Sequence, residues 1–117
     1  MKRIKLPVSA KKPPADLNWV KLGLSKDWLD FIGKFTRHGR PTHIQKVCLS
    51  DLKMLQVRRN LIVSAPTNSG KSLIGYLFLV AGLKHGKRVL LLEPFRALAQ
   101  EKYEELLDRS QVISDFL

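Results

Sequence analysis

The sequence predicts an α/β fold in which an N-terminal helical segment precedes a short parallel sheet. Continuous apolar runs are typical of parallel strands covered on both faces, and two such runs occur in the second half of the chain. Apolar residues at helical spacing occur before, between and after these runs, which is the order of helices layered on a parallel sheet. The predicted elements are, in order, a helix over 25–38, a helix from Thr42 to about Leu55, a strand over 60–64, a helix over 71–85, a strand over 88–93 and a helix over 95–108.

The first residues differ in composition from the rest of the chain. They are rich in Lys, Ala and Pro, and they carry too little apolar material to fold alone. We therefore expect residues 1–16 to be a flexible basic arm and residues 17–117 to be one domain. Two parallel strands are too few to bury helices on both faces, so this domain is expected to be incomplete and to need further strands.

The two helices of the N-terminal segment have capping signals. Ser25 precedes the first, in which Trp28, Leu29, Ile32 and Phe35 recur at helical spacing. Gly39-Arg40-Pro41 then breaks the chain. Thr42 with Gln45 three positions later predicts a capping box, in which each side chain bonds the other's backbone N–H.

Residues 65–72, Ala-Pro-Thr-Asn-Ser-Gly-Lys-Ser, lie between the first predicted strand and the next helix. This is the setting of a phosphate-binding loop, whose backbone N–H groups and helix N-terminus surround a β-phosphate. We expect Gly70 to allow close approach of the backbone, Lys71 to bind the β- and γ-phosphates, and Ser72 to ligate Mg²⁺. The other expected ligands are Pro66, Thr67, Asn68 and Ser69. The sequence thus predicts binding of a nucleoside triphosphate, whereas the alternative is a serine-rich turn that happens to end in Gly-Lys-Ser.

Positive charge is concentrated ahead of this loop. The chain has 21 Lys and Arg against 10 Asp and Glu, a net charge of +11. Through Asn60 there are 14 basic and 4 acidic residues, and from Leu61 onward 7 and 6, so the balances are +10 and +1. A basic region beside a nucleotide site favours contact with nucleic-acid phosphates. The alternatives are a solvated basic surface or non-specific adhesion to anions.

Other classes of function find little support in the sequence. It contains no apolar run of membrane-spanning length, lipidation signal or secretory signal, so we expect a soluble cytoplasmic protein without membrane contact. Cys48 is the only cysteine and lies between two apolar residues, as a buried small hydrophobe would. His38, His43 and Cys48 are each five residues apart, which places no two on one helical face, so they are not expected to bind a metal.

Three segments together resemble the first motor domain of superfamily 2 helicases, the DEAD-box and DExH-box group. Residues 65–72 resemble the family's first motif, A-x-T-G-S-G-K-T, and depart from it at Asn68 and Ser72. Residues 41–45, Pro-Thr-His-Ile-Gln, resemble its adenine-reading segment, P-T-x-I-Q. Residues 93–103 are similar to the motif P-x-R-A-L-A-x-x-K that follows the second strand. The resemblance implies a partial RecA-like P-loop domain of three layers.

The resemblance also implies roles for particular residues. Lys71 would serve catalysis, Gln45 would read the adenine edge through its amide, and Trp19 would stack on the base. The alternatives are that Gln45 only caps a helix and that Trp19 packs the arm onto the domain. Nucleic acid, DNA or RNA, would be contacted by Pro94, Arg96 and Ala97, although Arg96 could instead form a salt bridge with Glu93.

The family hydrolyses ATP with a D-E-x-D or D-E-x-H motif and with arginines from a second motor domain, and neither occurs here. We therefore expect this chain to bind ATP and Mg²⁺ without turnover, and to need the rest of the motor or a partner chain to complete its sheet. Two other functions stay open. One is a non-catalytic nucleic-acid-binding module with a relic phosphate loop. The other is a small P-loop kinase, although the expected acceptor-binding residues and arginine-rich lid are not evident.

Overall fold

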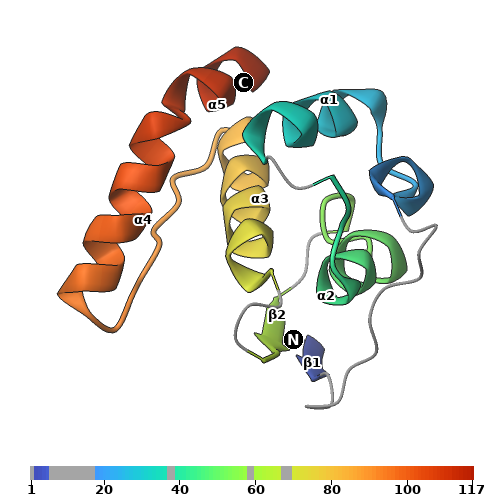
Figure 1. The fold of residues 1–117 in the computed structure, drawn as a ribbon, viewed down its shortest axis with the longest axis horizontal. Coiled ribbons are helices and arrows are strands. Elements are labelled where there is room, and N and C mark those ends of the chain that lie inside the picture. Colours follow the sequence, from blue (N-terminus) through green and yellow to red (C-terminus); the bar gives the residue numbers. More distant parts are fainter. Residues whose placement is uncertain (1, 6–17, 37–38, 58–59, 67–69) are drawn as a thin grey trace.

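The computed structural model describes residues 2–5, 18–36, 39–57, 60–66 and 70–117. The described part is mostly helical, and α3 lies at its centre, between the N-terminal helices and α4 (Figure 1). No helix in it is both long and apolar enough to cross a membrane. The elements are β1 (Lys2–Lys5), the 3₁₀ helix η1 (Trp19–Leu22), α1 (Lys26–Phe35), α2 (His43–Lys46), the π-helical turn η2 (Val47–Asp51), β2 (Leu61–Ser64), α3 (Lys71–Lys84), α4 (Arg96–Asp108) and α5 (Ser110–Phe116).

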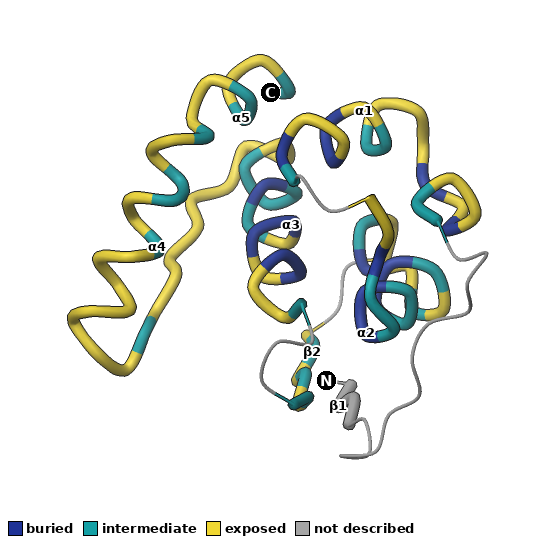
Figure 2. The backbone as a smooth tube through the Cα atoms, in the orientation of Figure 1, coloured by how far each residue is buried: buried dark blue, intermediate teal, exposed yellow. Residues whose placement is uncertain are grey.

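The apolar core lies between α1, the α2–η2 segment and α3. Figure 2 shows that the buried backbone positions gather in these elements, whereas α4 and the segment before it are exposed almost throughout. Cys48 is buried as predicted, and burial raises the pKa of its thiol to about 11. The fully buried side chains of the core include Ile32, Ile44, Cys48, Leu49, Leu77 and Val80.

The two N-terminal capping predictions are confirmed. The backbone N–H of Trp28 donates to Ser25 Oγ at 3.4 Å, which caps α1. Thr42 and Gln45 form the predicted capping box at the start of α2. The second helix is shorter than predicted, however, because it widens into η2 and ends before Lys53, whose φ of 51° is left-handed.

The strand predicted over 60–64 is present as β2, but its partner is unexpected. β2 pairs in parallel with β1, so that Lys2 lies opposite Leu61 and Lys5 opposite Ser64. Residues 2–5 are therefore a strand where a flexible arm was predicted. The other residues of that arm lie outside the described residues. Backbone N–H and C=O groups make the pairing, so the basic composition of this segment does not prevent it.

The prediction of a strand over 88–93 is wrong for this structure. The segment is irregular, and Leu90 and Leu92 are 80% and 78% exposed. Its Val-Leu-Leu-Leu run has the composition of a buried strand, but a strand also requires a neighbour to satisfy its backbone groups. The pairing partner described for β2 is β1. A three-layer α/β arrangement is therefore not visible in the described part.

The two C-terminal helices attach differently from each other. α4 confirms the helix predicted over 95–108, but it has no buried residue. Of its larger apolar side chains, Leu98, Tyr103, Leu106 and Leu107, only Leu106 is packed against the core. α5 was not predicted. It lies beside α1 (Figure 1), and the Phe116 ring stacks 4.5 Å from the Phe31 ring and 4.7 Å from the Trp28 ring, between centroids.

Candidate functional site

The predicted phosphate loop follows the strand β2 and leads into α3, as its sequence motif requires. The helix begins at Lys71, and Gly70 at its N-cap has a left-handed φ of 88°. The N-cap residue has no side chain to cap this end of α3, and the first turn of the helix has no acidic residue. The first N–H groups of a helix carry partial positive charge, so this end is electrostatically open to an anion. Thr67, Asn68 and Ser69, which were expected to line the loop, lie outside the described residues.

Lys71 lies across the mouth of the loop. Its Nζ donates a hydrogen bond to the backbone oxygen of Ala65 at 2.8 Å, which brings the two ends of the loop together. The side chain is exposed. A phosphate oxygen is a stronger acceptor for an ammonium group than a neutral carbonyl is. Lys71 can therefore exchange Ala65 for a phosphate without leaving the loop.

Gln45 connects the other predicted nucleotide segment to this loop. Its Oε1 accepts from the Thr42 N–H at 2.9 Å, and its Nε2 donates to the Gly70 oxygen at 3.1 Å. Gln45 is only 3% exposed. A carboxamide has two donors and two lone pairs, and these two bonds within the described residues use one of each. The structure thus gives Gln45 both its predicted capping role and a bracing role that the sequence did not predict.

The close contact of Gln45 with Gly70 is a second reason why position 70 requires glycine. A Cβ added there would lie 2.5 Å from Gln45 Nε2 and 2.8 Å from Thr42 Oγ1. The left-handed backbone already favours glycine. The sequence pointed only to the approach of a phosphate. The structure adds that the Thr42 and Gln45 side chains leave no room for a Cβ at this position.

Ser72, the predicted Mg²⁺ ligand, is exposed in the first turn of α3. Its hydroxyl accepts a hydrogen bond from Lys102 Nζ of α4 at 2.9 Å. A hydroxyl oxygen is a suitable ligand for Mg²⁺, and Lys71 and the open end of α3 suit the phosphates that would accompany the metal. The residues present therefore fit a Mg²⁺-bound triphosphate, although Lys102 uses the same oxygen.

Tyr76, one turn further along α3, contacts Glu105 of α4. Its hydroxyl donates to the Glu105 carboxylate. Burial and this hydrogen bond both raise the pKa of Tyr76 well above the usual range. Arg109 Nε donates to the backbone oxygen of Phe35 at 2.9 Å, so α4 is attached to α1 as well.

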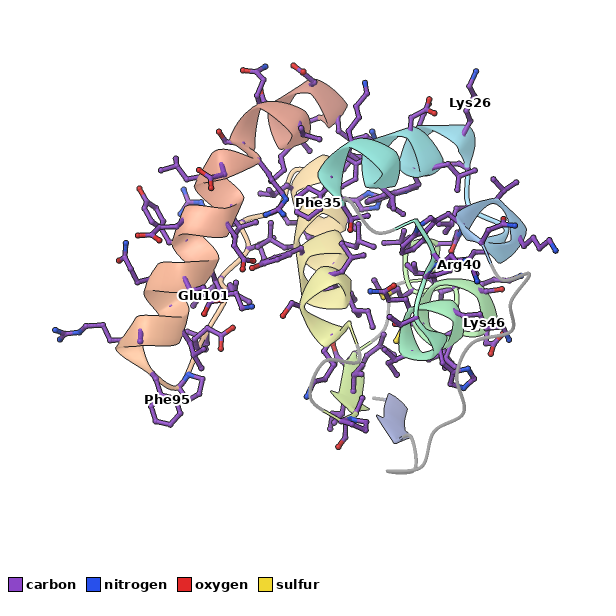
Figure 3. The ribbon with its side chains drawn as sticks, in the orientation of Figure 1. Lys26, Phe35, Arg40, Lys46, Phe95 and Glu101 are labelled. Carbon is purple, nitrogen blue, oxygen red and sulfur yellow. The ribbon has the colours of Figure 1, made fainter. Side chains whose placement is uncertain are left out.

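The remaining predicted residues lie apart from this cluster. Trp19 is partly buried in η1 and packs against the core. Pro94, Arg96 and Ala97 are exposed at the beginning of α4, the end farthest from α5 (Figures 1 and 3, in which Phe95 is labelled). Within the part of the chain that the structure describes, Arg96 forms no salt bridge with Glu93.

Comparison with known proteins gives relatives over part of the chain. It is 44% identical over 59 residues to DNA polymerase theta of Drosophila melanogaster, covering 50% of this chain and 3% of that protein. It is 41% identical over 58 residues to the ATP-dependent DNA helicase Hel308 of Methanocaldococcus jannaschii, covering 44% of this chain and 5% of the helicase. The Hel308 of Thermoplasma volcanium is 44% identical over 48 residues, covering 41% of this chain and 7% of that protein. The chain thus spans only a small fraction of the length of these relatives.

No solved structure matches the chain. The family model of the DEAD/DEAH box helicases matches residues 42–116, from the capping box of α2 through the predicted phosphate loop to α5. This match covers more than half of the sequence. The chain therefore belongs to the DEAD/DEAH box helicase family.

Proposed function

We propose that this chain is the ATP-binding and DNA-binding portion of an ATP-dependent helicase. One observation carries the proposal: a strand, a loop closed by Lys71 and an uncapped helix follow one another at the family's first motif. The match to the DEAD/DEAH box family supports the same function. DNA is favoured over RNA because relatives of this chain are named as DNA helicases and a DNA polymerase.

In this proposal the triphosphate lies against the N-terminus of α3. Lys71, which bonds the Ala65 oxygen in this structure, would bind the β- and γ-phosphates, and Ser72 would hold the Mg²⁺. When bound, Mg²⁺ neutralises charge between phosphate oxygens. Backbone groups of Gly70 and of residues 66–69 complete the phosphate contacts. As the family resemblance implies, Gln45 would recognise adenine through its amide, and Trp19 would stack on the base.

Binding of the DNA backbone is assigned to the start of α4. Pro94, Arg96 and Ala97 are exposed there, and the N-terminus of a helix of this length is itself attractive to phosphate. In a RecA-like motor, residues 88–93 would pair as a strand once neighbouring strands are present.

The proposal is tested by titrating the chain with a fluorescent ATP analogue in the presence of Mg²⁺. Lys71→Ala should weaken binding by about tenfold to a hundredfold, the effect of losing a charge-assisted hydrogen bond. Lys87→Ala removes the same charge from an exposed position beyond α3 and serves as the matched control. Equal affinity of wild type and Lys71→Ala would remove the phosphate-loop assignment.

A DNA titration separates the helicase portion from a binding module with a relic loop. Single-stranded DNA should bind more weakly at higher salt, as phosphate contacts require, and its affinity should change when the ATP analogue and Mg²⁺ are added. An unchanged DNA affinity with and without nucleotide would favour the relic module.

A further inference from the structure

The contact between Lys102 and Ser72 joins the predicted metal ligand to a cation of the protein itself. The two residues are 30 positions apart in sequence, and the ammonium nitrogen lies 2.9 Å from the hydroxyl oxygen. The same nitrogen lies 5.6 Å from the centroid of the Tyr76 ring, one turn further along α3. Lys102 thus lies over the first two turns of α3, beside the open end of that helix.

Two further contacts hold α4 so that Lys102 reaches this position. Glu105 accepts from the Tyr76 hydroxyl, and Arg109 donates to the Phe35 oxygen. Lys102 and Glu105 are three residues apart and share one face of α4, and Arg109 directly follows the end of that helix. The contact at Ser72 is thus one of three polar contacts that hold this segment against α1 and α3.

An ammonium group and a Mg²⁺ ion make the same demand on a hydroxyl oxygen. Lysine has three donors and no acceptor, so Ser72 must present a lone pair to it. Mg²⁺ also binds through an oxygen lone pair, and it requires near-ideal geometry at short distance. Two cations within hydrogen-bonding distance of one oxygen repel each other, and phosphate oxygens around the metal would fill the remaining space.

We propose that Lys102 is a built-in competitor of Mg²⁺ for Ser72, so that docked α4 holds the nucleotide site in a self-blocked state. Binding of a Mg²⁺-bound nucleotide then requires Lys102 to leave Ser72, and α4 to loosen from α3. The proposal rests on the proposed nucleotide binding at residues 65–72. It adds that α4, which carries the predicted DNA contacts at its first turn, is coupled to metal binding.

The test compares nucleotide affinity with and without metal. Wild type and Lys102→Ala are titrated with the fluorescent ATP analogue in Mg²⁺ and again in EDTA. Removal of a positive charge ordinarily weakens binding of an anion. The proposal predicts the opposite in Mg²⁺, a severalfold gain in affinity for Lys102→Ala, and no gain in EDTA. Lys87→Ala loses the same charge away from Ser72, and it should gain affinity in neither condition.

A second variant leaves Lys102 in place. Tyr76→Phe removes the hydroxyl that holds Glu105, so it should loosen α4 and also tighten binding in Mg²⁺. A direct readout is the labelling of the Lys102 amine by an acylating reagent, followed by mass spectrometry. Labelling should rise when the nucleotide is added with Mg²⁺ and should stay unchanged when it is added in EDTA.

The outcomes separate this inference from the proposed function. If binding depends on Lys71 but Lys102→Ala binds the Mg²⁺-bound nucleotide no better than wild type, the competition is refuted and the nucleotide site stands. The competition is also refuted if the extent of Lys102 labelling stays the same when the Mg²⁺-bound nucleotide is added. If binding does not depend on Lys71 in either condition, the proposed site fails, and the competition fails with it.

Discussion

Two regions of the described structure, α1 through α3 and residues 88–108, are held in place by different forces. From α1 through α3, apolar side chains are buried against one another, and Gln45 ties α2 to the start of α3. Residues 88–108 contain no buried residue, and α4 is attached by polar contacts to Tyr76 and Ser72 and by the partly buried Leu106. Arg109, the residue after α4, donates to the Phe35 oxygen. Burial of apolar surface is the larger contribution to stability, whereas single hydrogen bonds contribute little net. The first region should therefore unfold last, and α4 should detach before it.

The largest expected difference between the regions comes from one pair of identical substitutions. Leu77 is 0% exposed in α3, and Leu90 is 80% exposed in the segment before α4. Leu77→Ala should lower the free energy of unfolding by about 2–5 kcal/mol because it leaves a cavity. Leu90→Ala should change it by less than about 0.5 kcal/mol. Urea denaturation measures both, and a comparable loss in the two variants would show that residues 88–93 are packed.

Gly70 offers a test within the better packed region. Gly70→Ala should destabilise the protein by about 1–3 kcal/mol, since the residue must keep a left-handed backbone and its Cβ would meet Gln45. It should also weaken nucleotide binding. The matched control is Gly33→Ala in α1, where a Cβ meets nothing within 4 Å. There the same change should stabilise by about 0.5–1 kcal/mol. Thermal unfolding of both variants gives the comparison, which is contradicted if both shift in the same direction.

The smallest effect is expected where α4 meets α3. Tyr76→Phe removes the hydrogen bond to Glu105 and should cost about 1 kcal/mol or less. The effect should be local. Amide hydrogen exchange should accelerate in α4 and stay unchanged in the core of α3. Acceleration in both helices together would mean that the two regions unfold as one unit.

Features that depend on neighbouring residues could be predicted from the sequence. The caps at Ser25 and Thr42 and the helix after Lys71 each follow from side chains within one or two turns. α5 carried a usable signal that was missed, because Val112, Ile113 and Phe116 recur at helical spacing.

Features that depend on distant partners could not be predicted. The pairing of residues 2–5 with β2 uses backbone groups that every residue has. The run at 88–93 has strand composition but lacks a described neighbour to pair with. The bond from Gln45 to Gly70 joins residues 25 apart, and that from Lys102 to Ser72 residues 30 apart. No local sequence pattern predicts contacts between residues so far apart in the sequence. For the candidate site, the residue types and their order along the chain could therefore be predicted from the sequence. Which of their side chains contact one another could be learned only from the structure.

The brace formed by Gln45 has a consequence for how the loop can move. The Gln45 amide both caps α2 and donates a hydrogen bond to the carbonyl oxygen of Gly70. A ligand that moves Gly70 must therefore break this bond or displace the first turn of α2. The two segments then respond to an incoming molecule as one mechanical unit. The chemical shift of the Thr42 amide, followed by nuclear magnetic resonance, would therefore report ligand binding at the loop without a probe in the loop itself.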